Sequence, residues 1–210
     1  MPIGALSHDE INRIYGPWLE RTPADIAELL AEYSGRWWIA GGWSIEAFTG
    51  VKRHHSDIDP SIPRDELPLL RRHLAERIDL WAADQETLRV LLPGDVGEDQ
   101  LPNSCENVWA RSSGGDPWEY DIILMSVTED RWVFKHDSRI TRPVDEIVWT
   151  LDGIDYLRPE IQLLHKARGL RAKDQEDFDA AWPVLNINDQ RWLRDAIELT
   201  QPDHPWLATM

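Results

Sequence analysis

Hydrophobic and polar positions follow patterns that predict a mixed α/β part and then a helical part. Two short helices are expected first, the second over residues 23–33, with Thr22 as its N-cap and Pro23 at the first helical position. An apolar run then ends in the glycine pair Gly41-Gly42, and an amphipathic stretch follows. This order indicates a strand, a tight turn and a helix.

Strand patterns dominate the next hundred residues. A strand is expected over 57–62 and a helix over 64–76, and further strands are expected at 78–82, 87–92, 107–111, 118–125 and 131–134. From Arg158 onward the spacing is helical, with helices expected at 159–170, 174–182 and 189–200. The pattern predicts an α/β (α+β) domain over 1–155 with N-terminal helices and a helical subdomain over 156–210.

Composition narrows the class of protein. The chain has 210 residues, 42 % of them hydrophobic and 12 of them Trp, which is enough to bury a sizeable core. Cys105 is the single cysteine, so an intrachain disulfide is excluded and a reducing compartment is favoured. Neither a signal peptide nor an apolar run of about 18 residues is visible, so a cytoplasmic location is expected.

Charge points to the kind of partner. The formal net charge of −16 argues against a nucleic-acid partner and favours cationic ligands and metal ions. Residues 84–130 hold 11 acidic and 2 basic side chains. Residues 158–173 hold 5 basic side chains and a single acidic one, Glu160. Two solvated faces would explain the same asymmetry.

Asp57 and Asp59 form the most informative pair of acidic residues. Side chains two apart on a strand project to the same face, so two carboxylates are expected close together. Oxygen ligands of this kind suit Mg²⁺, which commonly binds one or two carboxylates and substrate phosphates. The upstream pair Gly41-Gly42 allows close approach of a phosphate to a helix N-terminus, where Ser44 adds a hydroxyl.

A third carboxylate enters an apolar strand. Asp121 precedes the run Ile122–Met125, where an unpaired carboxylate is costly. A metal ion, a substrate hydroxyl or a paired arginine would each explain it. Glu119 shares the face of Asp121, and Trp118 lies on the opposite face.

Segments that resemble a known family cover most of the chain from about residue 36: 41–50 with Arg53, His55, Asp57 and Asp59, then 118–121, 131–134, 139–143, 156–166, 173–178 and 204–207. They resemble the aminoglycoside nucleotidyltransferases of the polymerase-β-like superfamily, in particular the aminoglycoside-2″-adenylyltransferase type. One residue departs from the pattern, because Pro60 follows Asp59 where the family has an apolar strand residue. A proline there implies a strand that is at an edge, bulged or cut short.

The resemblance implies a polymerase-β-like fold with a mixed sheet, flanking helices and a C-terminal helical part. It implies transfer of AMP from ATP, with two Mg²⁺ ions, to a hydroxyl of a small acceptor such as an aminoglycoside antibiotic. Asp57, Asp59 and Asp121 would hold the metal ions, and Asp121 would be the general base, with Glu119 as the alternative for that role.

Other residues are weaker candidates. His55 matches the histidine of the family in this segment, so the resemblance implies that Arg53 and His55 contact the nucleotide or support the carboxylates. No Cys or further His lies at zinc-ligand spacing. Lys166 either meets the triphosphate or belongs to a basic helix surface. Trp109 and Trp118 lie in the acidic stretch and are candidates to border an acceptor pocket, although core packing is the simpler role for each.

Two other classes of function fit the same residues. One is a nucleotidyltransferase that modifies a protein or a tRNA end, as in a toxin–antitoxin pair, although the net charge weighs against tRNA. The other is a non-catalytic relative that only binds nucleotide, and the presence of all three aspartates speaks against it.

Overall fold

The computed structural model describes residues 6–85, 87–92 and 101–210. They form two compact units, which are considered separately. The first unit lies within residues 1–38 and 55–125, and the second comprises residues 39–54 and 126–210. The domain boundary expected near residue 155 stays a prediction, because compactness alone does not identify an independently folding domain.

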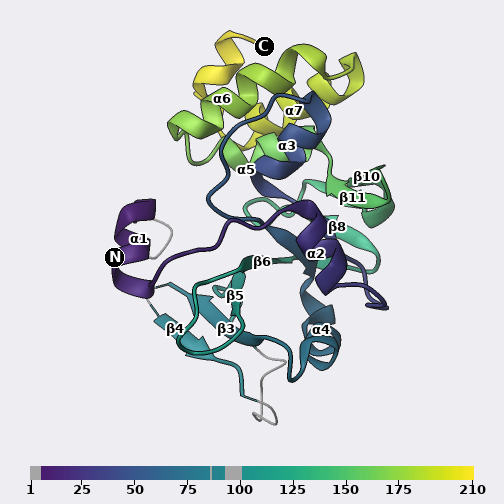
Figure 1. The fold of residues 1–210 in the computed structure, drawn as a ribbon. Coiled ribbons are helices and arrows are strands. Elements are labelled where there is room, and N and C mark those ends of the chain that lie inside the picture. Colours follow the sequence, from purple (N-terminus) through teal and green to yellow (C-terminus); the bar gives the residue numbers. More distant parts are fainter. Residues whose placement is uncertain (1–5, 86, 93–100) are drawn as a thin grey trace. The chain divides into compact units, whose positions relative to one another are not determined.

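The first unit is built on a mixed sheet (Figure 1). Its strands, in spatial order, are β2 (Pro60–Pro63), β6 (Tyr120–Met125), β5 (Asn107–Arg111), β3 (Asp79–Asp84) and β4 (Thr87–Val90). β2 and β6 are parallel, and the other neighbours are antiparallel. The predicted fold class, a mixed sheet with flanking helices, is confirmed.

The described helical segments of the first unit differ in how they begin, since only the first two have a side-chain cap. They are α1 (His8–Tyr15), α2 (Pro23–Leu29), a 3₁₀ turn (Arg64–Glu66) and α4 (Leu67–Leu74). The Thr22 side chain accepts a hydrogen bond from the backbone N–H of Asp25, as predicted for an N-cap. α2 is shorter than expected, because the chain turns after Leu30 and Glu32 adopts a positive φ of 64°.

The strand expected over 57–62 begins only at Pro60. Proline has no N–H to donate to a ladder, so it is tolerated at the first position of a strand. Asp57, Ile58 and Asp59 therefore precede β2. The Ile58 carbonyl still accepts a hydrogen bond from the Asp121 N–H at 3.1 Å, which extends the contact with β6 beyond the regular strand.

The second unit contains two small β structures. In the first, β10 (Val148–Leu151) and β11 (Ile154–Leu157) form a hairpin. Ile39 of β1 (Trp38–Ile39) pairs with Tyr156 of β11 in parallel. The other is a three-stranded sheet of β7 (Val127–Thr128), β8 (Arg131–Val133) and β9 (Thr141–Pro143). β8 confirms the strand expected at 131–134, whereas the sequence reading missed the hairpin.

The helices of the second unit pack together (Figure 1). They are α3 (Gly41–Thr49), α5 (Pro159–Lys166), α6 (Ala172–Ala181) and α7 (Ile187–Thr200). The aromatic rings of Phe178 on α6 and Trp206 stack, with 4.2 Å between their centroids. The predicted C-terminal helices are confirmed. None of the helices in the described ranges has the length and apolar character needed to cross a membrane.

Candidate active site

Asp59 and Asp121 are neighbours in the first unit. Ser61 of β2 pairs with Ile123 of β6 in parallel register, and Asp59 and Asp121 each lie two residues earlier in the chain. The Asp121 N–H donates to the carbonyl of Ile58, the residue before Asp59, at 3.1 Å, and the negative charge of Asp59 acts on Asp121. The pair expected from the sequence, Asp57 and Asp59, thus lies close to the third aspartate.

The electrostatics of Asp121 reflect this crowding. Burial raises the pKa of Asp121 well above its ordinary value, and the negative charges of Asp59 and, to a smaller extent, Asp57 raise it further. Hydrogen bonds from Asn107 and Trp109 act on the pKa of Asp121 in the opposite direction. The three aspartates therefore repel one another in a partly desolvated position.

The chemistry of these donors fits a divalent cation. Carboxylate oxygens are the ligands that Mg²⁺ prefers, and a cation would relieve the repulsion that raises the pKa of Asp121. In the part of the chain that the structure describes, no group of three or more His, Cys, Asp or Glu side chains is arranged closely enough to hold a metal ion. Asp57, Asp59 and Asp121 therefore share a region without forming a finished ligand shell.

Asn107 is a residue that the sequence reading missed. Its side-chain Nδ2 donates a hydrogen bond to Oδ1 of Asp121 at 2.7 Å. Asn107 opens β5 and pairs with Ile123, so it is the diagonal neighbour of Asp121 across the strands. Only the register of β5 against β6 brings the two together, and a polar residue at a strand end gives no signal of it.

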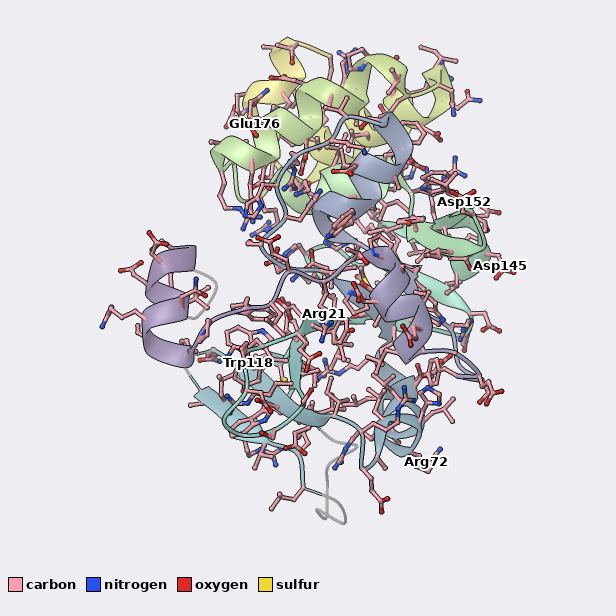
Figure 2. The ribbon with its side chains drawn as sticks, viewed as in Figure 1. Arg21, Arg72, Trp118, Asp145, Asp152 and Glu176 are labelled. Atoms are coloured by element: carbon pink, nitrogen blue, oxygen red, sulfur yellow. The ribbon has the colours of Figure 1, made fainter. Side chains whose placement is uncertain are left out.

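The Glu119 carboxylate accepts hydrogen bonds from Arg21 and Ser112. Its Oε2 accepts a hydrogen bond from Arg21 Nη2 at 2.5 Å, and its Oε1 accepts hydrogen bonds from the backbone N–H and the hydroxyl of Ser112. The Glu119 side chain is 6 % exposed, and Figure 2 labels Arg21 in the first unit. Both oxygens of this carboxylate are therefore occupied by donors.

Trp109 and Trp118 are buried in an aromatic cluster of the first unit. Their ring centroids are 5.3 Å apart, and Figure 2 labels Trp118. Trp118 donates its indole N–H to the carbonyl of Tyr15 at 2.8 Å, and the Arg111 guanidinium lies 4.0 Å from its ring centroid. Ile11, Tyr15, Trp18, Trp81, Ala83 and Leu88 pack against the pair. Packing therefore accounts for most of the surface of both rings.

The glycine pair begins α3, and Ala40 alone separates it from β1. Gly41 has a φ of +66°, which favours glycine, and its N–H donates to Oε1 of Gln162 at 2.8 Å. Gly42 is buried. The Ser44 hydroxyl donates to the Gly41 carbonyl at 2.9 Å, and Ser44 is fully buried. This first helical turn is therefore held by hydrogen bonds within the second unit.

Two predicted nucleotide-binding cations meet on one carboxylate in the second unit. Lys166 Nζ lies 2.8 Å from Oδ2 of Asp177, and Arg53 Nε lies 3.0 Å from Oδ1 of the same residue. Lys166 also pairs with Asp174 at 3.2 Å, and Arg171 binds Asp174 at 2.8 Å. The lysine side chain is 5 % exposed, so it is not part of a solvated basic surface.

His55, another predicted nucleotide-binding residue, opens the segment of the first unit that leads to Asp57. It is largely buried. The candidate residues thus fall into two groups. Asp57, Asp59, Asp121 and His55 belong to the first unit, and Arg53, Lys166 and the start of α3 belong to the second.

Comparison with known proteins identifies a family pattern in part of the chain. Residues 24–96, which include Asp57 and Asp59, match the family described as aminoglycoside-2″-adenylyltransferase. No curated protein matches the chain significantly. The prediction of a nucleotidyltransferase enzyme is confirmed at the level of the matched family.

Three solved structures share the fold. The chain is similar to the solution structure of the antibiotic-resistance factor ANT(2″)-Ia, with 17 % identity, a TM-score of 0.52, and coverage of 84 % of this chain and 89 % of that one. For the crystal structure of ANT(2″)-Ia with adenylyl-2″-tobramycin, the identity is 16 % and the TM-score 0.51, and the match covers 84 % of this chain and 94 % of that one. For the lincomycin-bound lincosamide antibiotic adenylyltransferase LnuA, the identity is 16 % and the TM-score 0.50, and the match covers 78 % of this chain and 96 % of that one.

These likenesses establish the fold, and the matched segment contains the first two aspartates. Residues 24–96 carry the sequence pattern of the aminoglycoside-2″-adenylyltransferase family, and the chain has the polymerase-β-like nucleotidyltransferase fold.

Proposed function

We propose that this protein transfers AMP from ATP to a hydroxyl group of a small cationic acceptor of the aminoglycoside type. The observation that carries the proposal is the position of Asp59, the residue before β2, close to Asp121 of the neighbouring strand β6. Asp57 and Asp59 fall inside the segment that matches the adenylyltransferase family, which supports the same reaction.

Each aspartate has a role in this proposal. Asp57, Asp59 and Asp121 would hold Mg²⁺, which supplies charge neutralisation at the triphosphate when it is bound. Asp121 accepts the proton of the acceptor hydroxyl. The hydroxyl oxygen forms a bond to the α-phosphorus while the bond from that phosphorus to the bridging oxygen breaks, and pyrophosphate leaves with its electron pair. An oriented base of this kind contributes roughly 10²–10⁴-fold to the rate.

Binding of the nucleotide is assigned to cations and backbone groups of the chain. Lys166 and Arg53, which Asp177 holds together, would pair with phosphate oxygens. Gly41, Gly42 and Ser44 begin α3, where backbone N–H groups favour a phosphate. His55 lies two residues before Asp57 and would support the nucleotide or the carboxylates.

A cationic acceptor is supported by charge. The acidic excess of residues 84–130 suits ammonium groups. Glu119 already neutralises Arg21, and Trp109 and Trp118 are almost completely buried. These three residues would therefore support the residues that line an acceptor site, and they would not supply its exposed charges.

The test is pyrophosphate release from Mg·ATP with tobramycin, other aminoglycosides and lincomycin, with mass spectrometry of each product. The proposal expects a gain of one AMP by an aminoglycoside. Asp57→Asn is expected to abolish the gain with an unchanged unfolding temperature, and Asp65→Asn, at an exposed position after β2, is the matched control. Absence of any AMP-modified product, or full activity of Asp57→Asn, would contradict the proposal.

A further inference from the structure

Asn107 and Asp121 come from different strands and share one face of the sheet. β5 and β6 are antiparallel, with Trp109 opposite Asp121 and Asn107 opposite Ile123. Residues that face each other across an antiparallel pair project to the same side, and so do residues two apart on one strand. Asn107 therefore reaches Asp121 diagonally, at 2.7 Å from Nδ2 to Oδ1.

The chemistry of the pair fixes which amide atom faces the acid. An ionised carboxylate only accepts hydrogen bonds, so the NH₂ end of the Asn107 amide must point to Asp121. Asn107 is half-buried at the start of β5, and its own backbone is held in the β5–β6 and β5–β3 ladders. The donor is therefore supplied from a rigid element rather than from a loop.

We propose that Asn107 is a positioning residue that fixes the orientation of the Asp121 carboxylate for proton abstraction. This inference rests on the proposed function, in which Asp121 is the general base. With Oδ1 held by the amide, the rotation of the carboxylate about its χ2 angle is restricted. Trp109 also donates a hydrogen bond to Asp121, and the lone pairs that neither Asn107 nor Trp109 uses then keep one direction toward the acceptor hydroxyl.

Loss of this hydrogen bond should slow the chemical step more than it weakens binding. Asn107→Leu keeps a side chain of similar size and removes the donor, and it is expected to lower kcat roughly 10–100-fold, as outer partners of catalytic groups do. The KM values for ATP and for the acceptor are expected to stay within about twofold. Asn103→Leu, at an exposed position shortly before β5, is the matched control and should keep full activity.

A spectroscopic readout tests the contact without turnover. In ¹⁵N-labelled protein, the side-chain amide signal that disappears in Asn107→Leu is that of Asn107, and this signal should shift when Asp121 is changed to Ala. Asn107→Ser, whose hydroxyl is too short to reach Oδ1, replaces Asn107→Leu in the kinetic test if the leucine variant does not fold.

The outcomes separate this inference from the proposed function. Failure of the wild-type protein to modify any acceptor would overturn the proposed function. An Asn107 amide signal that Asp121→Ala leaves in place would overturn the positioning role. So would wild-type transfer that Asn107→Leu or Asn107→Ser leaves at full kcat. A lower kcat with unchanged KM, together with the shifted signal, supports it.

Discussion

Lys166 and Asp177 form a buried ion pair in the second unit, with 2.8 Å between Nζ and Oδ2. Arg53 binds the other oxygen of the same carboxylate at 3.0 Å. The Lys166 and Asp177 side chains are only 5 % and 4 % exposed, so solvent screens the pair weakly. Asp177 therefore neutralises two cations from distant parts of the sequence.

Asp177→Asn should destabilise the protein. The change leaves Lys166 without one of its two carboxylate partners, and breaking a buried pair costs about 3 kcal/mol. Urea unfolding measures the loss. Glu176→Gln is the control, because Glu176 is exposed on α6 (Figure 2) and should change the free energy of unfolding by less than about 0.5 kcal/mol. Equal stabilities of the two variants would show that the ion pair contributes nothing.

Lys166→Met should weaken nucleotide binding. If Lys166 pairs with phosphate oxygens, removal of a charge-assisted hydrogen bond raises the Kd of a non-hydrolysable Mg·ATP analogue about tenfold or more. Calorimetry on the folded variant measures this Kd, with Lys173→Met on α6 as the control. A Kd equal to that of the wild type would leave Lys166 with a purely structural role.

Asp121→Asn and Glu119→Gln should affect the reaction very differently. Asp121→Asn removes the proposed base and should lower kcat at least 10²-fold. Glu119→Gln weakens the contact with Arg21 and should lower stability by about 1–3 kcal/mol, while kcat stays within about threefold. Steady-state rates and thermal unfolding of both variants check this. The opposite order of rates would make Glu119 the base.

His165 should make the stability of the protein depend on pH. Burial and, to a smaller extent, the positive charges of Lys135 and His136 lower the pKa of His165 from 6.5 to about 3. Its Nε2 is buried without a hydrogen-bond partner in the described structure. Below about pH 6.5 the unfolded chain takes up a proton that the folded chain does not, so stability falls as pH drops from 6.5 toward 3.

His165→Leu should reduce this fall in stability between pH 7 and pH 5. Thermal unfolding at both pH values measures it, and His54→Gln, at an exposed histidine, is the control. A leucine variant with the same pH dependence as the wild type would show that His165 is protonated in the folded protein.

Local sequence signals were sufficient for many elements. Thr22 and Pro23 marked the start of α2, and β5 was predicted at the observed positions, Asn107–Arg111. Capping residues and turn residues act within a few positions, so they can be identified without knowledge of the fold. The strand predicted over 57–62 was wrong at its start, because β2 begins at Pro60. Of the three interpretations of this proline, an edge, bulged or shortened strand, the structure shows the shortened one.

The hairpin of β10 and β11 was missed although it carries a local signal. Asp152 and Gly153 have φ values of +51° and +80° and form the two-residue connection, for which Asp-Gly is a favoured sequence. The flanking strands have only four residues each, and their burial is uneven, so their alternation is weak.

The contacts around the candidate site depend on pairing across the chain. Asn107 meets Asp121 through strand register, and Arg53 meets Asp177 across 124 positions of sequence. Neither contact leaves a trace in the spacing of residues. Motif resemblance identified Asp57, Asp59 and Asp121 as candidates, whereas the groups that orient and neutralise the candidate residues emerged only from the folded chain.

The central claim, transfer of a nucleotide rather than of a phosphoryl group, is tested most directly by the fate of labelled ATP. Tobramycin is incubated with the protein, Mg²⁺ and either [α-³²P]ATP or [γ-³²P]ATP, and the antibiotic is separated and counted. The account predicts that label from the α position stays on the antibiotic, that label from the γ position leaves in pyrophosphate, and that Asp121→Asn abolishes the transfer. Label from the γ position on the antibiotic, or transfer that does not depend on Asp121, would contradict it.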